Sequence, residues 1–343
     1  MKFRVALNGF GEAGQMLLHH IYSSQLSQHF EVVAINELEP SFACLHELRF
    51  NPKLQTSRAY QISCTNQQIR INNHVTRYFS VLNESKLPWK ELDVDLVVES
   101  SDSSNQFATC QQHLDYGAKQ VLNASNAYPS NRMWVNGVNG ETFTAKNSVI
   151  EQASGLTQAI APIIASITKN FEVEHCHIEH LQKSNSNQPW LDQNQMEIFT
   201  RSTGADLSLP KNLLELAELK AVFPTLASAL SGRAVQCRFK SHSLVLLNFD
   251  LVKSVSYSDV ISVLEKACQF EYRSVIGLHP NKLLTDKLNS QLRASYISLE
   301  RTSVLRKQIR LPVFFDNDDI SASRLFEFAA SLRIFSKETS QAV

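Results

Sequence analysis

The chain has 343 residues, 43% of them hydrophobic, which is enough for two domains with sizeable cores. Its 33 basic residues equal its 33 acidic residues, and this balance argues against partners that a global charge would attract, namely nucleic acid and anionic membranes. Six cysteines are scattered without metal-ligand or disulfide-framework spacing. The first apolar stretch is too short for a signal peptide or a membrane span, so we expect a cytoplasmic protein with reduced thiols.

Strand and helix patterns alternate over the first half of the chain. A strand is predicted from Phe3 to Leu7, followed by a glycine-rich turn and a helix with apolar residues at Met16 and Ile21. Buried strands are also predicted at EVVAINEL (31–38), DVDLVVESS and KQVLNAS, with an amphipathic helix over 107–116 between the last two. This order is typical of an α/β fold with a doubly wound parallel sheet.

The pattern changes after Ala153. A helix is predicted over 156–170, and long alternating or apolar segments follow at 173–181 and 234–252, which suits a sheet with helices on one side. Residues 316–336 carry apolar residues at helical spacing. The polar segment 183–195 is the predicted mobile loop. We predict a Rossmann domain over 1–153, a second domain over 154–317, and a C-terminal helix over 318–343 that packs back on the first domain.

A dinucleotide motif lies between the first predicted strand and helix. Gly9, Gly11 and Gly14 form GxGxxG, in which glycines permit a tight turn and the approach of a pyrophosphate to the helix N-terminus. Glu37 follows about 20 residues later, at the end of the second strand, where a carboxylate accepts hydrogen bonds from an adenosine ribose. That carboxylate would repel a 2′-phosphate, so the sequence predicts NAD rather than NADP. An empty fold that retains its turn glycines for packing is the alternative.

Glu12 allows two interpretations. Its charge at the start of the helix opposes a pyrophosphate at the same place, or its side chain points to solvent and merely complements the helix dipole.

Six segments, in order along the chain, resemble phosphorylating glyceraldehyde-3-phosphate dehydrogenases. NGFGEAG resembles the family's NGFGRIG, VVAINEL its VVAINDL, MWVNGVN its MFVxGVN, QASGLTQAIAP its NASCTTNCLAP, RSTGA its SSTGA, and FFDNDD its WYDNET. The resemblance implies an N-terminal Rossmann domain, a C-terminal α+β catalytic domain, and NAD as cofactor. The cofactor-binding residues it implies, together with the motif, are Gly9, Phe10, Gly11, Glu12, Ala13, Gly14, Glu37, Ser101 and Asn317.

The same resemblance implies a changed catalytic centre. The family's cysteine nucleophile falls at Gly155, and its histidine base falls at Gln182, a neutral amide that cannot take a proton near neutral pH. Covalent aldehyde oxidation requires a thiolate activated by a base, so the sequence predicts a pseudoenzyme for that reaction. The positions that match the family's phosphate-binding groups predict an anion pocket: Ser154, Thr203, Gly204 and Arg238.

Other family positions differ as well. Asn185 stands where the family has a second phosphate-binding threonine, Ser321 replaces the tyrosine near the nicotinamide, and Asp102 replaces the glycine after the fourth strand. The segment 182–202 is shorter than the family loop that contacts NAD and forms the tetramer core. The resemblance implies a homo-oligomer, and the shorter segment leaves dimer and tetramer open.

A few other residues could in principle replace the family's nucleophile and base. Ser154 with His180 could form a nucleophile and base, but the simpler interpretation is a hydrogen-bonding serine and an ordinary polar histidine. Cys176 reads more simply as a buried structural thiol. The histidines at 175, 177 and 180 do not predict a metal site, because strand alternation sends the last of them to the other face.

Three functions remain open at this point. The first is an NAD-binding member of the family that is silent in covalent aldehyde oxidation and acts as a sensor of phosphate or a phosphorylated metabolite, a regulator or a partner subunit. The second is an NAD-dependent oxidoreductase that acts on an aldehyde or oxo group of a small phosphorylated substrate without the family cysteine. The third is a structural or interaction role with an empty crevice.

Overall fold

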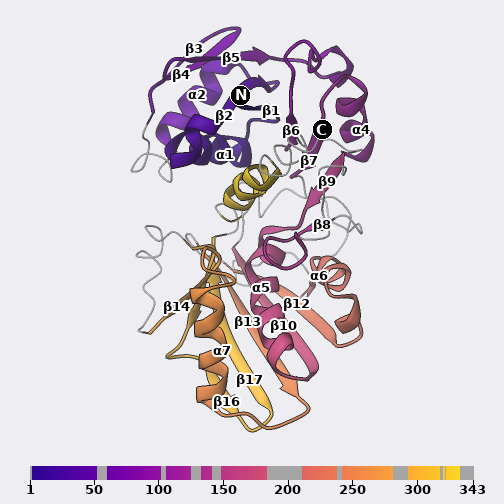
Figure 1. Cartoon of the computed structure of the whole chain (residues 1–343), viewed down its shortest axis with the longest axis vertical. Coiled ribbons are helices and arrows are strands. Elements are labelled where there is room, and N and C mark those ends of the chain that lie inside the picture. Colours follow the sequence, from indigo (N-terminus) through magenta and orange to yellow (C-terminus); the bar gives the residue numbers. More distant parts are fainter. Residues whose placement is uncertain are drawn as a thin grey trace, which may run out of the picture. The chain divides into compact units, whose positions relative to one another are not determined.

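The computed structural model of the chain describes residues 2–51, 60–101, 106–124, 133–140, 148–183, 211–237, 242–280, 293–316, 320 and 322–332 (Figure 1). The chain divides into two compact units. Unit 1 comprises Met1–Ser154 with Ser321–Val343, and unit 2 comprises Gly155–Ile320. Within the described ranges, no helix has the length and hydropathy to cross a membrane.

Unit 1 is built on a sheet with the order β3-β4-β5-β2-β1-β6-β7-β9-β8. From β5 to β8 neighbouring strands run parallel, whereas β3, β4 and β5 form antiparallel hairpins. The strand bounds are β1 (Phe3–Asn8), β2 (Phe30–Asn36), β3 (Ile62–Thr65), β4 (Gln68–Ile71), β5 (His74–Phe79), β6 (Leu96–Glu99), β7 (Gln120–Asn123), β8 (Met133–Trp134) and β9 (Val149–Gln152).

Apolar side chains cover both faces of this sheet. On one face Val5 and Leu7 of β1 pack with Leu17 of α1 (Glu12–Ser23) and with Leu325 and Phe328 of the helical residues 322–332. The other face buries a second cluster, which includes Ala6, Trp89, Val97 and Cys110, the last from α4 (Gln106–Asp115). α2 (Ser41–Phe50) and the short helices η1 (Gln25–His29) and η2 (Glu84–Lys86) complete the unit. The two covered faces confirm the doubly wound α/β prediction.

Unit 2 is a mixed sheet with the order β11-β12-β10-β13-β17-β15-β14, and β16 pairs with β17. The strand bounds are β10 (Val173–Lys183), β11 (Lys211–Asn212), β12 (Leu230–Cys237), β13 (Ser243–Leu251), β14 (Ile276–His279), β15 (Ser295–Ser298), β16 (Ser303–Leu305) and β17 (Gln308–Phe315). The predicted segment 234–252 therefore contributes to two strands. The helices are α5 (Gly155–Asn170), α6 (Leu216–Val222), the short η5 (Pro224–Leu226) and α7 (Tyr257–Gln269).

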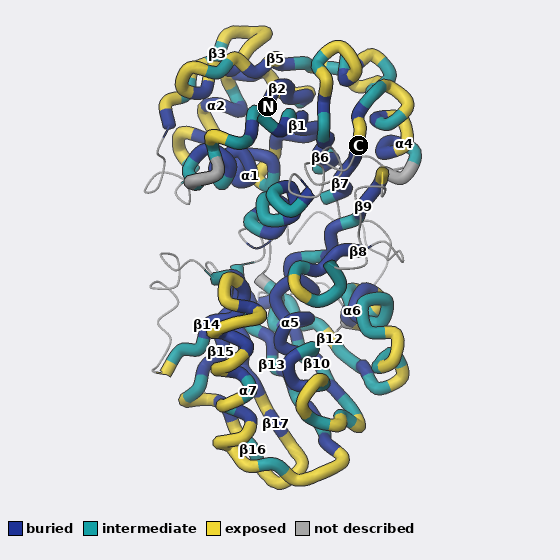
Figure 2. The backbone as a smooth tube through the Cα atoms, in the orientation of Figure 1, coloured by how far each residue is buried: buried dark blue, intermediate teal, exposed yellow. Residues whose placement is uncertain are grey.

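The helices α5 and α7 lie over one face of this sheet (Figure 1). Burial alternates residue by residue along β13, so one face is buried and the other is half-exposed (Figure 2). β10 follows the same rule: Cys176, Ile178 and His180 are buried, whereas His175 and His177 are half-exposed. α7 begins with a capping box in which Ser256 and Asp259 exchange hydrogen bonds, which fixes its first turn. The α+β prediction for the second domain is confirmed.

Candidate functional site: a nucleotide crevice and an altered catalytic helix start

The glycine turn adopts the geometry that a nucleotide loop requires. Gly9 has φ +91°, and a Cβ added there would lie 2.6–2.7 Å from backbone atoms of Ser100 and Ser101, so only glycine fits. A Cβ on Gly14 would lie 2.7 Å from the carbonyl oxygen of Gly9, so the third glycine lets the helix pack under the turn. Around the Cβ position of Gly11, in contrast, no heavy atom lies within 4 Å. The middle glycine thus faces open space, which is the arrangement that a glycine loop needs if a pyrophosphate is to approach its backbone.

This turn lies where strand order reverses. β1 pairs with β2 on one side and with β6 on the other, and β1 ends at Asn8, directly before the glycines. In open α/β sheets, ligands bind outside the carboxyl ends of the strands at such a switch point. Gly11 is the N-cap of α1 and supplies no side-chain cap, so the first amides of the helix face this crevice. The residues present therefore fit a dinucleotide.

Glu37 faces the glycine turn, as the sequence predicts. Its Oε2 accepts a hydrogen bond from the Phe10 amide at 2.6 Å, and its Oε1 accepts one from the Leu38 amide at 2.7 Å. A carboxylate has about four lone-pair positions, so acceptor capacity remains for ribose hydroxyls. The ribose contact itself stays a prediction.

Glu12 is exposed in the first turn of α1. Its exposure agrees with the interpretation in which the side chain points to solvent, although its charge remains close to the helix start.

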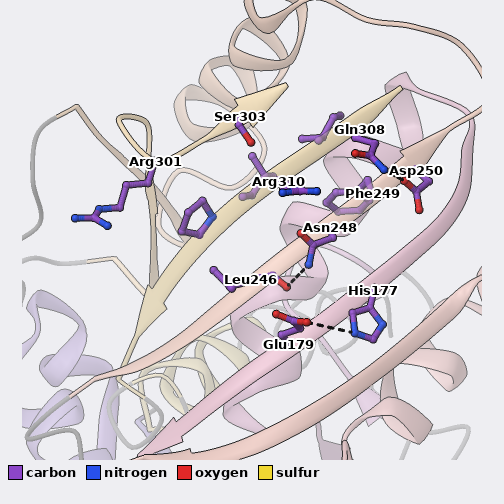
Figure 3. Close-up of a pocket in the computed structure, with 13 residues that line it drawn as sticks. His177, Glu179, Leu246, Asn248, Phe249, Asp250, Arg301, Ser303, Gln308 and Arg310 are labelled. Carbon is purple, nitrogen blue, oxygen red and sulfur yellow. Dashed lines mark hydrogen bonds and ion pairs between the residues drawn. The ribbon is translucent and has the colours of Figure 1, made fainter. Parts of the chain in front are cut away.

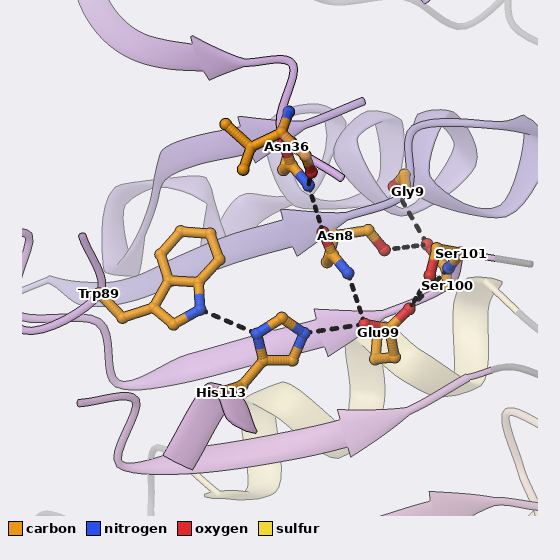
Figure 4. Close-up of polar contacts among 9 residues, drawn as sticks. Asn8, Gly9, Asn36, Trp89, Glu99, Ser100, Ser101 and His113 are labelled. Carbon is orange, nitrogen blue, oxygen red and sulfur yellow. Dashed lines mark hydrogen bonds and ion pairs between the residues drawn. The ribbon is translucent and has the colours of Figure 1, made fainter. Parts of the chain in front are cut away.

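Ser101 belongs to a buried polar network that the sequence analysis missed (Figure 4). The Ser101 amide and hydroxyl both donate to Oε1 of Glu99, at 2.8 and 2.5 Å. Oε2 of Glu99 accepts from Asn8 Nδ2 at 2.6 Å and contacts His113 Nε2 at 2.8 Å. Glu99 and His113 are fully buried. The available signal was an acidic residue at the end of the apolar run DLVVE, since a charge in a buried strand needs partners.

The family's nucleophile and base positions both lie in unit 2. Gly155 is the buried first residue of α5, and Gln182 is a half-buried residue near the end of β10. Two residues further along α5, the Thr157 hydroxyl donates to Glu218 Oε2 of α6 at 2.7 Å. The helix dipole favours a carboxylate at a helix N-terminus, so the Glu218 carboxylate already places a negative charge beside the first turn of α5.

His180 is buried with 3% of its surface exposed, and neither ring nitrogen has a hydrogen-bond partner among the residues that the structure describes. Its ring lies 5.7 Å from the ring of Phe315, measured between centroids. Burial lowers the pKa of His180 to about 4, which keeps the imidazole neutral near neutral pH. Such a weak base does not support the pairing with Ser154, which is half-buried and forms interactions of its own.

The cysteines of unit 2 lack the features of a reactive thiol. All six thiols are free, and the three in unit 2 are Cys176, Cys237 and Cys268, all buried. Burial raises the pKa of Cys176 to about 12 and that of Cys268 to about 11, and it also raises the pKa of Cys237. Reactive cysteines require the opposite shift, because the thiolate is the nucleophile. Cys176 is a buried thiol, as its position in the strand predicts.

Several candidate residues lie outside the described residues: Thr203, Gly204, Arg238, Asn317, Asn185, Ser321 and Asp102. The predicted loop 183–195 is also outside them from residue 184 on. Asp250 contacts Gln308 at 3.1 Å and His175 at 3.8 Å.

A hollow of about 530 Å³ lies on the half-exposed face of the unit 2 sheet (Figure 3). Its lining includes His177, Glu179, Asp250, Arg301 and Arg310. His177 and Glu179 point to the face opposite His180, so the hollow is separated from the altered catalytic positions by the sheet itself. Within the described part of the chain, no group of three histidine, cysteine or acidic side chains has metal-binding geometry.

A Rossmann domain with a glycine turn at its switch point, followed by an α+β domain, is typical of two-domain nicotinamide-dependent dehydrogenases. Two family profiles match the chain: "Glyceraldehyde 3-phosphate dehydrogenase, NAD binding domain" over residues 3–106, and "Glyceraldehyde 3-phosphate dehydrogenase, C-terminal domain" over residues 154–317. The chain is 24% identical to a glyceraldehyde-3-phosphate dehydrogenase of Pseudomonas aeruginosa over 332 residues, which covers 97% of this chain and 98% of that protein. The chain belongs to the glyceraldehyde-3-phosphate dehydrogenase family, and the cofactor of its nucleotide-binding domain is NAD.

Proposed function

We propose that this member of the family binds NAD but does not carry out covalent aldehyde oxidation, and that it acts as a sensor, a regulator or a partner subunit. One observation carries the proposal. The residue at the family's nucleophile position, Gly155, has no side chain, and the unit 2 cysteines are buried with raised pKa values. Without a thiolate there is no thiohemiacetal and no acyl-enzyme, whatever the quality of the crevice.

The ligand that we propose for unit 2 is phosphate or a small phosphorylated metabolite. This rests on the resemblance of Ser154, Thr203, Gly204 and Arg238 to the family's anion-binding groups, because a guanidinium binds phosphate through two hydrogen bonds. The internal carboxylate of Glu218 beside Thr157 occupies part of the start of α5 and would weaken an anion there. A homo-oligomer and a cytoplasmic location likewise remain predictions from the sequence.

His180 favours a second candidate function, which is direct hydride transfer between NAD and an aldehyde or oxo group of a phosphorylated substrate. A neutral buried imidazole keeps one N–H donor and one acceptor, and within the described ranges neither has a partner. Such a group can donate a hydrogen bond to a carbonyl oxygen without a covalent intermediate. The carbonyl carbon of the substrate would receive the hydride from the reduced cofactor, and the carbonyl oxygen would receive a proton from an acid in unit 2.

The two candidates differ in turnover and share NAD binding. Isothermal titration with NAD should give saturable binding to the full chain, and binding that is absent at millimolar NAD would leave only the interaction role. An assay of NADH oxidation with phosphorylated aldehydes and ketones then separates them. Turnover that is lost in His180→Phe supports the second candidate, and no turnover supports the first.

A further inference from the structure

We propose that Glu99 positions the NAD crevice: its carboxylate holds the Ser100–Ser101 turn against the glycine turn and makes Ser101 a hydrogen-bond acceptor for the cofactor. This inference rests on the binding of NAD by unit 1. It depends on the direction of every hydrogen bond in the network, and two separate chains of contacts fix those directions.

The first chain begins at Trp89. The indole N–H is only a donor, and it donates to His113 Nδ1 at 2.9 Å. His113 Nδ1 therefore carries a lone pair, and the proton of the neutral ring resides on Nε2. That nitrogen lies 2.8 Å from Glu99 Oε2, so His113 donates to the carboxylate. Trp89, His113 and Glu99 are fully buried, so water does not supply an alternative arrangement.

The second chain begins at the backbone of Val81. Its amide donates to Asn36 Oδ1 and its carbonyl accepts from Asn36 Nδ2, both at 2.9 Å, which fixes the orientation of the Asn36 amide. Asn36 Nδ2 also donates to Asn8 Oδ1 at 2.7 Å. Asn8 therefore presents its own Nδ2 to Glu99 Oε2 at 2.6 Å. Two donors of fixed direction thus meet on one oxygen of Glu99, so that this atom must be an acceptor.

The other oxygen of Glu99 receives the amide and the hydroxyl of Ser101. Because the hydroxyl proton is committed to Glu99, the remaining lone pairs of Ser101 Oγ can only accept. Ser101 is half-buried, so this acceptor is available at the crevice edge. It suits an N–H or O–H donor of the cofactor, such as a ribose hydroxyl or an amino group.

The same carboxylate joins the two walls of the crevice. It bonds Asn8 at the end of β1 and Ser101 just beyond the end of β6. Between these contacts, Ser100 Oγ donates to the Gly9 carbonyl at 3.1 Å, and the backbone from Ser100 to Ser101 fills the space in which a Gly9 side chain would lie. A shift of Ser101 therefore shifts the surface on which the glycine turn rests.

Glu99→Gln tests this arrangement with nearly the same shape. The new amide must place its NH₂ toward one pair of donors. The pair from Asn8 and His113 is fixed in direction, so the NH₂ turns toward Ser101, whose hydroxyl can rotate but whose backbone N–H loses its acceptor. The turn should loosen, and the Ser101 hydroxyl should accept from the new NH₂ and direct its own proton away from residue 99, so that it no longer presents only an acceptor to the cofactor. Trp89→Phe is the matched control, because it perturbs the same buried network at its far end, while the carboxylate 2.8 Å from His113 Nε2 still favours the proton on that nitrogen and so keeps four donors on Glu99.

The experiment combines NAD titration with amide hydrogen exchange on the full chain, at a temperature where circular dichroism shows each variant folded. We expect Glu99→Gln to weaken NAD binding about tenfold or more, because a factor of ten corresponds to about 1.4 kcal/mol, just below the range for the loss of one hydrogen bond to a charged group. It should also deprotect the Ser101 amide in the absence of NAD. Trp89→Phe should bind NAD within about twofold of the wild type and keep that amide protected.

Several results would overturn the proposal: a folded Glu99→Gln variant with unchanged NAD affinity, a Ser101 amide that stays protected in it, or a control that loses as much affinity as the test variant. If the wild type itself does not bind NAD, the account of the cofactor fails, and the exchange of the Ser101 amide still decides whether Glu99 positions the turn. If Glu99→Gln does not fold, Ser101→Ala removes the acceptor directly, and unchanged NAD affinity in that variant contradicts the inference.

Discussion

The glycine turn supplies a matched pair of substitutions, Gly9→Ala and Gly11→Ala. Gly9 has φ +91°, which costs a residue with a Cβ about 1–2 kcal/mol. The new Cβ would also lie 2.6–2.7 Å from the Ser100–Ser101 backbone, and relieving such overlap typically costs about 1–3 kcal/mol. Gly9→Ala should therefore lower the unfolding free energy of unit 1 by about 2–5 kcal/mol. Gly11 has φ −69° and open space at its Cβ, so Gly11→Ala should cost less than about 1 kcal/mol.

NAD binding should distinguish Gly11→Ala from Gly9→Ala as clearly as stability does. A methyl group on Gly11 occupies the space where the pyrophosphate approaches, so Gly11→Ala should keep its stability and lose NAD affinity. Urea unfolding followed by tryptophan fluorescence measures the stability, since Trp89 and Trp134 are both buried in unit 1. Equal stability of the two variants, or a larger loss in Gly11→Ala, would refute the strain assigned to Gly9.

Three further predictions concern unit 2. Because the pKa of His180 falls to about 4 in the folded state against about 6.5 when unfolded, the unfolded state binds more protons between these values, and stability rises with pH there. From pH 7 to pH 5 this group should cost about 2 kcal/mol in urea unfolding, and His180→Leu should remove that slope; an unchanged slope contradicts the assignment. Alkylation by iodoacetamide at neutral pH, read by peptide mass spectrometry, should be slow at Cys176 and Cys268, whose pKa values are raised to about 12 and about 11; rapid modification of Cys176 would show an activated thiolate. Phosphate should raise the melting temperature of the wild type but not of Arg238→Ala, and equal shifts in both would end the phosphate-sensor proposal.

Much of unit 1 could be predicted because its signals are local. The strand predicted at Phe3–Leu7 is β1 (Phe3–Asn8), and the run that begins at Glu31 is β2 (Phe30–Asn36). Glycine spacing fixed the turn between β1 and α1, and strand order then placed Glu37 against it. In unit 2, likewise, the helix predicted over 156–170 is α5 (Gly155–Asn170). Periodicity and turn chemistry are sufficient for features of this kind.

The Glu99 network could not be predicted in the same way. It requires the indole of Trp89, the imidazole of His113 and the amide of Asn8 to meet at one carboxylate, and these residues come from separate parts of the chain. Only tertiary packing brings them together, so the sequence shows no more than an acidic residue in an apolar strand. The state of His180 could not be predicted for the same reason: strand alternation predicts the face on which the ring lies, but not that its described neighbours offer its nitrogens no partner.

The most direct test of the central claim is a reaction of the full chain with NAD, inorganic phosphate and glyceraldehyde 3-phosphate, in which NADH formation and the intact protein mass are followed together. Because Gly155 offers no nucleophile and the unit 2 thiols are buried with raised pKa values, we predict no NADH above background and no acyl adduct on the protein. Turnover of about 1 s⁻¹ or more, in the ordinary range of enzymes, together with an acylated chain would contradict the account.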